Sequence, residues 1–253
     1  MKLSLGHLIY GLAAILFGLI GLVWHDFNNW QQIRILGQIP HREILASIIA
    51  IIEIIGGLLI LSKKTARYGA IILGTTYLIF AVLWVPFILK SPLVYDNWGN
   101  FFEQFSLVSG AMIIYSIADP GNSGNKMKIA RPGYFIFGIC VVSFTLEQLF
   151  YLSGTASFVP KWIPPGQMFW AITTTIALAL AAIALLTGYS ALLAARLLIV
   201  MIICFGLLIW LPSVFSDPHK MFNWAGNAEN LGIAGAAWIV ADYLSQLKTS
   251  SPG

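Results

Sequence analysis

Charged residues are scarce in this chain, and their scarcity excludes a water-soluble globular protein. Asp, Glu, Lys and Arg make up 9% of the 253 residues, while hydrophobic residues make up 58%. Soluble domains carry about a quarter charged residues, and a soluble fold of this size cannot hide so much apolar surface. The formal net charge of +4 does not indicate nucleic-acid binding, because the cationic residues stand at the ends of apolar segments. The sequence therefore predicts a protein immersed in a lipid bilayer.

Cysteine is scarce, and the known catalytic or metal-binding motifs are absent from the sequence. The two cysteines, Cys140 and Cys204, lie inside apolar segments 64 residues apart. We expect two buried thiols, with a disulfide between them as the alternative. No P-loop, G-x-G-x-x-G, G-x-S-x-G, H-x3-H or E-x-x-H pattern occurs in the sequence. The sequence thus indicates no catalytic residue, no metal site and no motif-bound cofactor.

Long apolar segments are abundant instead, and they predict an all-α integral membrane protein. A helix needs about 20 mostly apolar residues to cross the hydrocarbon core, and its backbone groups then pair within the segment. Eight segments meet this requirement: 7–24, 42–62, 66–89, 99–118, 132–153, 166–187, 190–212 and 227–247. Nine Lys and Arg residues fall on the side of the termini and five on the other, which predicts that both termini face the cytoplasm.

A pattern of rare residues occurs twice in the chain, which indicates an internal duplication. The pattern is W-x-P-x5-P-x4-N-W-x4-E-[QN], and its copies run without a gap at an offset of 126 residues. The copies consist of Trp84, Pro86, Pro92, Asn97, Trp98, Glu103 and Gln104, and of Trp210, Pro212, Pro218, Asn223, Trp224, Glu229 and Asn230. Chance does not explain six identities at one offset, and self-similarity at a fixed period marks a repeated structural unit.

The duplication predicts how the eight segments are organised. We expect two tandem four-helix bundles, residues 1–118 and 132–253, joined by a cytoplasmic linker at 119–131 that is rich in Gly, Asn and Lys. Because each unit has an even number of spans, both copies enter the membrane in the same sense. The two units are then related by a pseudo-two-fold axis along the membrane normal.

Acidic residues inside the spans are the main candidates for function. Four of the five glutamates lie there: Glu53, Glu103, Glu147 and Glu229. An acid at the centre of a bilayer costs about 2.5–3.5 kcal/mol on insertion scales, so it is a functional hypothesis by default. Glu53 and Glu147 stand away from the helix starts. Each is therefore either protonated or hydrogen-bonded within the bundle, in a structural contact, a binding pocket or a proton path.

Glu103 and Glu229 are repeat equivalents, and helix capping is the plainest explanation for both. The segments ending at these glutamates resemble capping boxes at the start of the fourth and eighth spans. Contact with a ligand or partner and proton handling are the alternatives. Asn97 and Asn223 are either further caps or, with the neighbouring tryptophans, the floor of a polar pocket. The predicted ligand-binding residues are Glu53, Glu103, Glu147, Glu229, Asn97, Trp98, Asn223 and Trp224.

Each half of the chain resembles the DoxX-like family of bacterial membrane proteins. The residues that carry the resemblance are Phe158-Val-Pro-Lys-Trp-Ile-Pro-Pro before the sixth span, and Trp84-Val-Pro followed by Asn97-Trp98 and Glu103. The family takes its name from membrane subunits associated with thiosulfate:quinone oxidoreductase. The resemblance implies a four-helix unit, here in tandem, a place in the bacterial cytoplasmic (inner) membrane, and a quinone or redox partnership. It implies no catalytic residue.

Three kinds of function are consistent with these observations. The first is a binding or accessory subunit that holds a hydrophobic small molecule, quinone or lipid, or docks a membrane redox or secretion partner. The second is the membrane subunit of a quinone-linked oxidoreductase that works with a soluble redox subunit. The third is a transporter with its path at the repeat interface. We favour the first, because the chain shows no electron carrier of its own and no span that is clearly broken in mid-membrane.

Overall fold

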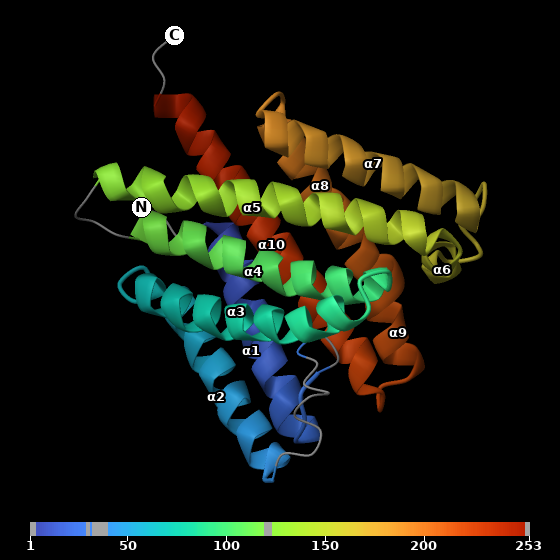
Figure 1. The fold of residues 1–253 in the computed structure, drawn as a ribbon, viewed down its shortest axis with the longest axis horizontal. Helices are drawn as coiled ribbons and strands as arrows, with labels where there is room; N and C mark the ends of the chain where they lie inside the picture. The colour runs from blue at the N-terminus through green and yellow to red at the C-terminus, as the bar shows by residue number, and fades with distance from the viewer. Residues whose placement is uncertain (1–3, 29–30, 32–39, 119–122, 251–253) are drawn as a thin grey trace.

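The computed structural model of the chain describes residues 4–28, 31, 40–118 and 123–250, and every regular element in these ranges is a helix. The prediction of an all-α protein is thereby confirmed for the described residues. In chain order the elements are α1 (Leu5–Trp24), α2 (Arg42–Ile60), α3 (Ala66–Lys90), α4 (Tyr95–Ala118), α5 (Ser123–Phe150), α6 (Leu152–Phe158), α7 (Gln167–Thr187), α8 (Ala191–Phe205), the π-helical η1 (Gly206–Trp210), α9 (Leu211–Ser216) and α10 (Met221–Ser250) (Figure 1).

The described residues contain seven helical segments that are long and apolar enough to cross a membrane. They are α1, α2, α3, α4, the part of α5 from Lys128 to Phe150, α7, and the continuous stretch from Ala191 to Ser216 formed by α8, η1 and α9. These segments correspond to the first seven predicted spans, and they support the prediction of a multi-pass membrane protein.

Three helices begin between four and nine residues before the predicted positions: α4 at Tyr95, α5 at Ser123 and α10 at Met221. The prediction placed each start where the apolar run starts, whereas the helices continue through polar residues next to the run. As a result α5 occupies most of the predicted linker 119–131. Residues 119–122 lie outside the described residues.

The eighth predicted span lies within α10, which is less apolar than the seven candidates and is not among them. Its position accounts for its composition. α10 packs against α1, α4 and α8, and its described large apolar side chains are all at least partly buried. A helix surrounded by other helices has little surface for lipid, so small and polar residues can line it. Figure 1 shows α10 crossing behind α4 and α5.

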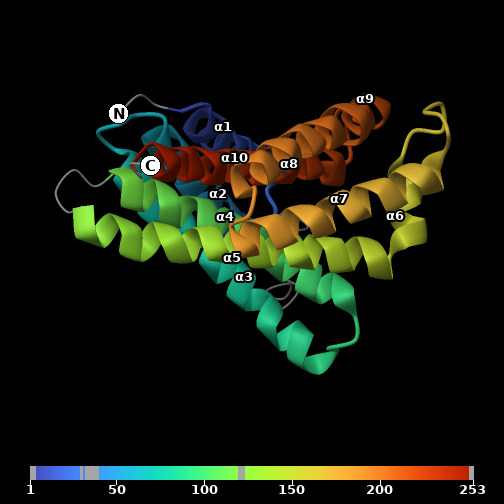
Figure 2. The same cartoon turned by 90° about the horizontal axis from the view of Figure 1, so that it is seen from above.

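Each half of the chain packs its first helix against the last helix of the other half. α1 packs against α2 and along α10, whereas α5 packs against α7 and along α4. α4 and α10 also contact each other where the halves meet. The helices therefore do not form two self-contained bundles. Figure 2 shows the start of α5 and the end of α10 at one end of the molecule, with α6 at the other.

The contact between α4 and α10 is parallel and joins equivalent parts of the two copies. Gln104 of α4 donates a hydrogen bond to Glu229 of α10. About one turn further along both helices, a Cβ atom added to Gly232 would lie 2.9 Å from the Leu107 side chain. Both pairs are 125 residues apart in the sequence, within one residue of the repeat offset. Equivalent faces of the two copies therefore meet side by side.

The close approaches of α1 and α5 are equivalent as well. A Cβ atom added to Gly6 of α1 would lie 3.0 Å from Ile239 of α10, and one added to Gly133 of α5 would lie 3.1 Å from Ile113 of α4. The two isoleucines are 126 residues apart. A glycine at each crossing lets the helices approach closely, as small residues do between membrane helices. The duplication thus extends from the sequence motif to the crossing of helices between halves.

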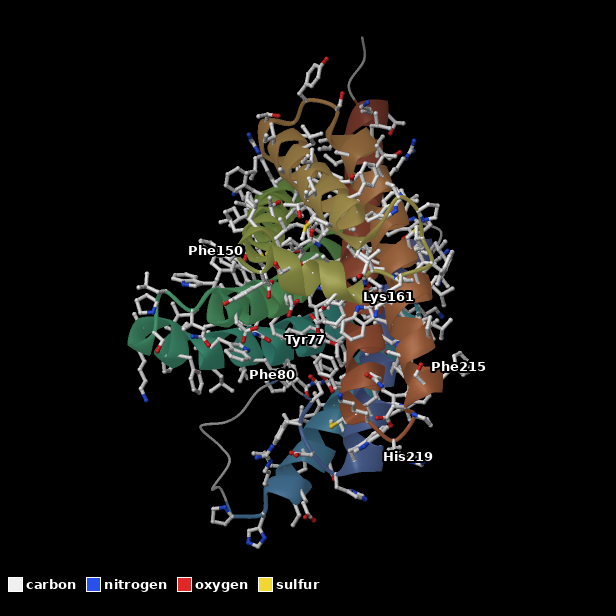
Figure 3. All side chains as sticks on the ribbon, turned by 90° about the vertical axis from the view of Figure 1, so that its right-hand side faces the viewer. Tyr77, Phe80, Phe150, Lys161, Phe215 and His219 are labelled. Atoms are coloured by element: carbon white, nitrogen blue, oxygen red, sulfur yellow. The ribbon has the colours of Figure 1, made fainter. Side chains whose placement is uncertain are left out.

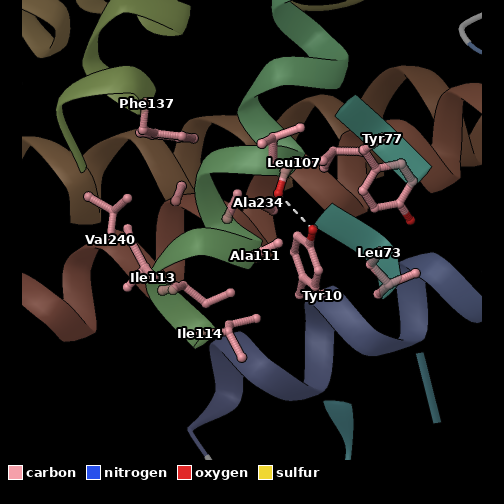
Figure 4. Close-up of a cluster of buried hydrophobic side chains, with 14 of the residues drawn as sticks. Tyr10, Leu73, Tyr77, Leu107, Ala111, Ile113, Ile114, Phe137, Ala234 and Val240 are labelled. Carbon is pink, nitrogen blue, oxygen red and sulfur yellow. Dashed lines mark hydrogen bonds between the residues drawn. The ribbon is translucent and has the colours of Figure 1, made fainter. Parts of the chain in front are cut away.

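Apolar side chains cover the outside of the molecule and also fill its interior. Phe150 and Phe215 are 67% and 79% exposed, whereas Tyr77 is buried (Figure 3). Large apolar patches are rare on the surface of soluble monomers, and they are favourable against lipid. In the interior, the Tyr10 hydroxyl donates a hydrogen bond of 2.7 Å to the Leu107 carbonyl and ties α1 to α4 (Figure 4).

The cysteines are both free thiols in different settings. Cys140 is buried in α5, as the sequence predicts, but Cys204 is exposed on α8. The prediction for Cys204 is wrong because a residue inside an apolar segment can face outward toward lipid. The alternative of a disulfide between them is not realised.

Candidate functional site

Two of the four predicted acidic residues are buried in the interior of the molecule, within electrostatic range of each other. Glu53 of α2 and Glu229 of α10 are 1% and 3% exposed, and their carboxyl groups are close enough to repel each other when charged. Glu53 Oε1 accepts a hydrogen bond of 2.5 Å from Gln31 Nε2. Glu229 Oε2 accepts one of 3.3 Å from Gln104 Nε2. We call these four residues the acid cluster.

Two buried tyrosines lie beside the acid cluster. The rings of Tyr10 from α1 and Tyr77 from α3 meet edge to face, with their centroids 6.4 Å apart. Both are within electrostatic range of Glu229, and Tyr77 is also within range of Glu53. Because the Tyr10 hydroxyl already donates to a backbone carbonyl, it fixes the position of the helices around the cluster. Helices from both halves of the chain therefore surround these acids.

One side of the pair formed by Glu229 and Gln104 lacks a hydrogen bond. Glu229 Oε1 and Gln104 Oε1 are both buried, and neither has a partner among the residues that the structure describes. An unsatisfied buried polar group costs about 1–3 kcal/mol, and both of these oxygens are acceptors. The pair therefore calls for a hydrogen-bond donor, which is either a proton on Glu229 itself or a donor group of another molecule.

The acid cluster is not repeated in the other half of the chain. In this part of the chain Ile39-Pro40 matches Ile163-Pro164 at an offset of 124 residues, so the position equivalent to Glu53 is Ala177. Glu103, the repeat equivalent of Glu229, is only half-buried and lies near Glu147 of α5 instead. The two halves share an arrangement of helices but differ in the polar side chains that these helices carry. The acid cluster therefore occurs once in the molecule and has no counterpart at the repeat-equivalent position.

A second group of acidic residues lies between α4 and α5. The Glu147 carboxyl group rests against Gly99, where an added Cβ atom would overlap it. It is also within electrostatic range of Glu103 and Asp96. Neighbouring carboxylates repel one another, which favours a proton or a cation between them. The structure thus separates the four predicted glutamates into two pairs, one deeply buried and one half-buried.

Helix capping is the wrong explanation for Glu103 and Glu229. Each residue lies eight positions after the first residue of its helix, which is about two turns. The N–H groups that a capping box satisfies belong to the first turn. Both glutamates therefore occupy helix interiors, and their repetition needs an explanation other than capping.

Asn97 and Asn223 tie α4 and α10 to the ends of the preceding helices. Asn97 Nδ2 donates to the Phe87 carbonyl at 3.4 Å, and Asn223 Nδ2 donates to the Ser213 carbonyl at 2.9 Å. Both carbonyls also accept a backbone N–H, from Ser91 and from Asp217, so each amide adds a second hydrogen bond at the end of α3 or α9. The two asparagines act as donors here and do not cap their own helices, contrary to one of the two predicted roles.

Trp98 and Trp224 make the same local bond in both copies. Their Nε1 atoms donate to the carbonyls of Pro92 at 3.1 Å and Pro218 at 2.9 Å. The acceptor is a backbone carbonyl, so this bond accounts for the repeated six-residue spacing between the turn and the tryptophan, and not for the proline side chain itself. The indoles are thus fixed at the turns that lead into α4 and α10, and the polar pocket predicted for them stays a prediction.

Sequence reasoning does not identify several residues of the site. Gln31 lies in a connection and carries no signal, although it donates to Glu53. Gln104 belongs to the repeated pattern. Its position next to Glu103, a glutamate inside a predicted span, is the sequence feature that could have identified it as a site residue. Ser4, His7 and Asp242 line a separate cavity toward the far end of α10, and they come from the two ends of the chain, so no spacing connects them.

Comparison with known proteins assigns no family to the chain. No protein-family model, no curated protein and no solved structure matches it. The interpretation of the site therefore rests on its geometry.

Proposed function

We propose that this membrane protein is a binding subunit that holds the polar head of a hydrophobic small molecule at the acid cluster. The observation that carries the proposal is the pair of unsatisfied acceptors, Glu229 Oε1 and Gln104 Oε1, beside a second buried acid, Glu53. Ionisable residues inside transmembrane segments are costly and are associated with function. A molecule with an apolar tail can reach such a site from the lipid, which is why we retain quinone or lipid as the ligand class.

The chemistry of the unsatisfied atoms selects among such molecules. Both oxygens accept hydrogen bonds, so the head of the ligand has to donate. A quinol carries two hydroxyl donors, and a lipid with a hydroxylated headgroup carries similar ones. An oxidised quinone offers only carbonyl acceptors. We therefore expect the acid cluster to prefer a quinol over the corresponding quinone.

Proton handling is the second candidate function, and the geometry of the same pair favours it. A protonated Glu229 can donate from Oε1 to Gln104 Oε1 while Gln104 Nε2 donates to Glu229 Oε2. A single proton would then satisfy both oxygens and close a reciprocal ring between the acid and the amide. In this case the acid cluster stores a proton inside the membrane, next to the second carboxyl group of Glu53.

The substitution Glu229→Gln is expected to weaken quinol binding by about tenfold or more, because a hydrogen bond to a charged group contributes about 1.5–3 kcal/mol. Binding of a short-chain quinol to the protein in nanodiscs can be measured through quenching of tryptophan fluorescence. Glu103→Gln is the control, since it makes the same change at the repeat-equivalent position outside the acid cluster. Equal affinities for both variants and the unchanged protein would overturn the ligand-binding proposal.

Infrared spectroscopy separates the two candidate functions. A protonated Glu229 contributes a carboxylic-acid carbonyl band that is lost in Glu229→Gln and kept in Glu103→Gln. This band in ligand-free protein, with unchanged quinol affinity, supports proton handling. Its absence, with weakened quinol binding, supports the ligand site. A Glu229→Gln variant that alters neither measurement rules out both.

We also propose that α10 is an eighth span, and that the two sets of four spans are related by a pseudo-two-fold axis along the membrane normal. The parallel contact between equivalent residues of α4 and α10 supports this arrangement. The cytoplasmic location of the termini follows from the distribution of Lys and Arg. Membership of the DoxX-like family and a bacterial inner membrane rest on the sequence resemblance alone.

Thiol labelling of intact cells tests this topology. Single cysteines at Leu93 and His219, in exposed turns of the two halves, are introduced into a chain with Cys140→Ala and Cys204→Ala. We expect both to react with a membrane-impermeant maleimide from the periplasmic side. A cysteine at Tyr189 is the control and should react only after the cells are opened. Labelling of the two turns from opposite sides would refute the axis along the membrane normal.

The oxidoreductase and transporter alternatives make further demands. An oxidoreductase subunit requires a soluble electron donor that docks on the protein and reduces quinone through it. A transporter requires two gates. η1 is the observation that bears on transport, because π-helical segments occur frequently at functional sites and this one interrupts the α-helical stretch from α8 to α9. We rank both alternatives after ligand binding. The unsatisfied oxygens of Glu229 and Gln104 require a hydrogen-bond donor, and they require neither a soluble electron donor nor a pair of gates.

A further inference from the structure

A polar cavity of about 240 Å³ lies where the start of α1 meets the ends of α4 and α10. Its lining residues are Ser4, His7, Ile117, Ile239, Asp242, Ser245 and Gln246. Asp242 follows Glu229 by 13 residues along α10, which corresponds to about 20 Å along the helix. The cavity is therefore separate from the acid cluster and lies near the end of the molecule where the described chain begins and ends.

Ser4 lies beside both titratable residues of this cavity. Ser4 Oγ lies 2.8 Å from His7 Nδ1, and the Ser4 side chain is near the Asp242 carboxyl group. When the Ser4 hydroxyl group, which has one proton to donate, points toward Asp242, His7 Nδ1 is the donor to Ser4 Oγ. In a neutral imidazole of this tautomer, His7 Nε2 is an acceptor.

Two unsatisfied acceptors belong to residues that line this cavity. His7 Nε2 and Asp242 Oδ2 are buried, and neither has a hydrogen-bond partner within the described part of the chain. His7 is only 4% exposed, so its ring nitrogen cannot turn to bulk water. Asp242 forms no ion pair with a described lysine or arginine. The cavity thus combines one negative charge with a neutral acceptor, and it contains no described positive charge.

We propose that this cavity binds a primary ammonium group. Such a group carries a positive charge that complements the Asp242 carboxylate, together with three N–H donors. Two of the donors satisfy Asp242 Oδ2 and His7 Nε2, and the third can reach the side-chain oxygen of Ser245 or Gln246. Ile117 and Ile239 supply apolar walls for the carbon atoms next to the nitrogen. Two sources share this chemistry: the headgroup of an aminophospholipid and a free short-chain amine.

The choice of an ammonium group follows from what the cavity lacks. An anion would be repelled by the Asp242 carboxylate and would find no described cation. A divalent metal ion is disfavoured, because the described residues contain no group of three or more His, Cys, Asp or Glu side chains that could hold one. A quaternary ammonium carries the same charge but has no N–H group, so it cannot satisfy the two acceptors. The contrast between primary and quaternary amines is therefore the sharpest test.

The test compares the full-length protein in nanodiscs of phosphatidylethanolamine with nanodiscs of phosphatidylcholine, and adds free ethanolamine to the latter. We expect thermal stabilisation by the primary amine, from lipid or free ethanolamine, and none by phosphatidylcholine. Asp242→Asn should weaken ethanolamine binding about tenfold or more. Asp217→Asn, at an exposed acid outside the cavity, should leave it unchanged. Stabilisation by the lipid alone assigns the site to a headgroup, and stabilisation by free ethanolamine assigns it to a small amine.

Two results would overturn the proposal. The first is equal stabilisation by both lipids with no effect of ethanolamine, which is measured on the unchanged protein and does not depend on whether a variant folds. The second is full retention of ethanolamine binding in Asp242→Asn.

Discussion

Gln104→Leu is expected to lower the thermal stability of the protein sharply. The substitution removes a hydrogen-bond donor to the buried carboxyl group of Glu229 and leaves both carboxyl oxygens without a described partner. Removing one partner of a buried polar pair costs about 1–3 kcal/mol, and more when the remaining group is charged. Thermal unfolding in detergent, followed by intrinsic tryptophan fluorescence, measures the change.

The double variant Gln104→Leu with Glu229→Leu is the decisive companion. Replacing both partners by apolar groups of similar shape is nearly neutral, so the double variant should recover most of the stability that either single variant loses. A double-mutant cycle then gives the coupling energy of the pair. Additive losses would show that the two side chains do not interact, and would remove the basis for assigning either function to them.

Gly235→Ala is expected to disrupt the crossing of α1 and α10. The added Cβ atom would lie 2.7 Å from the backbone nitrogen of Tyr10 and 2.8 Å from its Cα atom. Backbone atoms cannot rotate away as the end of a side chain can, so the helices have to separate. Overpacking of this kind typically costs about 1–3 kcal/mol. The separation should also break the bond from Tyr10 to Leu107 and shift the acid cluster.

Gly154→Ala is the control for this prediction, and it should change stability in the opposite direction. The nearest atom to a Cβ at Gly154 is 3.9 Å away, which is an ordinary contact. In a helix, alanine is more favourable than glycine by about 0.8–1.0 kcal/mol. Gly154→Ala should therefore be neutral or slightly stabilising in the same unfolding assay. Similar losses for both variants would mean that the helix crossing is not as close as the structure shows.

The helices and the repeat are predictable from sequence because each leaves a local signal. An apolar run indicates a span whatever lies beside it. The repeated six-residue spacing before Trp98 and Trp224 corresponds to a local bond from each indole N–H to a backbone carbonyl. The lateral order of the helices leaves no such signal. Lipid and neighbouring helices are equally apolar, so nothing in the apolar surface of α1 indicates that α10, rather than α4, is its partner along its length.

The sequence likewise predicts some features of the candidate site and not others. Glu53 and Glu229 are predictable as site residues because acids are costly inside a membrane. Their meeting is not predictable, since they are 176 residues apart and are brought together by the exchange of helices between halves. The capping interpretation of Glu229 failed because it depends on where a helix begins, and apolarity marks the bilayer rather than the helix end.

The packing of α1 against α10 has a consequence for the synthesis and membrane insertion of the chain. Ile239 is synthesised 233 residues after Gly6, and at about 5–20 residues per second the first helix waits roughly 10–50 s for its partner. During translation the glycine-containing face of α1 is therefore held by lipid or by the insertion machinery. A polypeptide that terminates before α10 can never bury that face, so incomplete products should be recognisable to membrane proteases by this one unpaired helix.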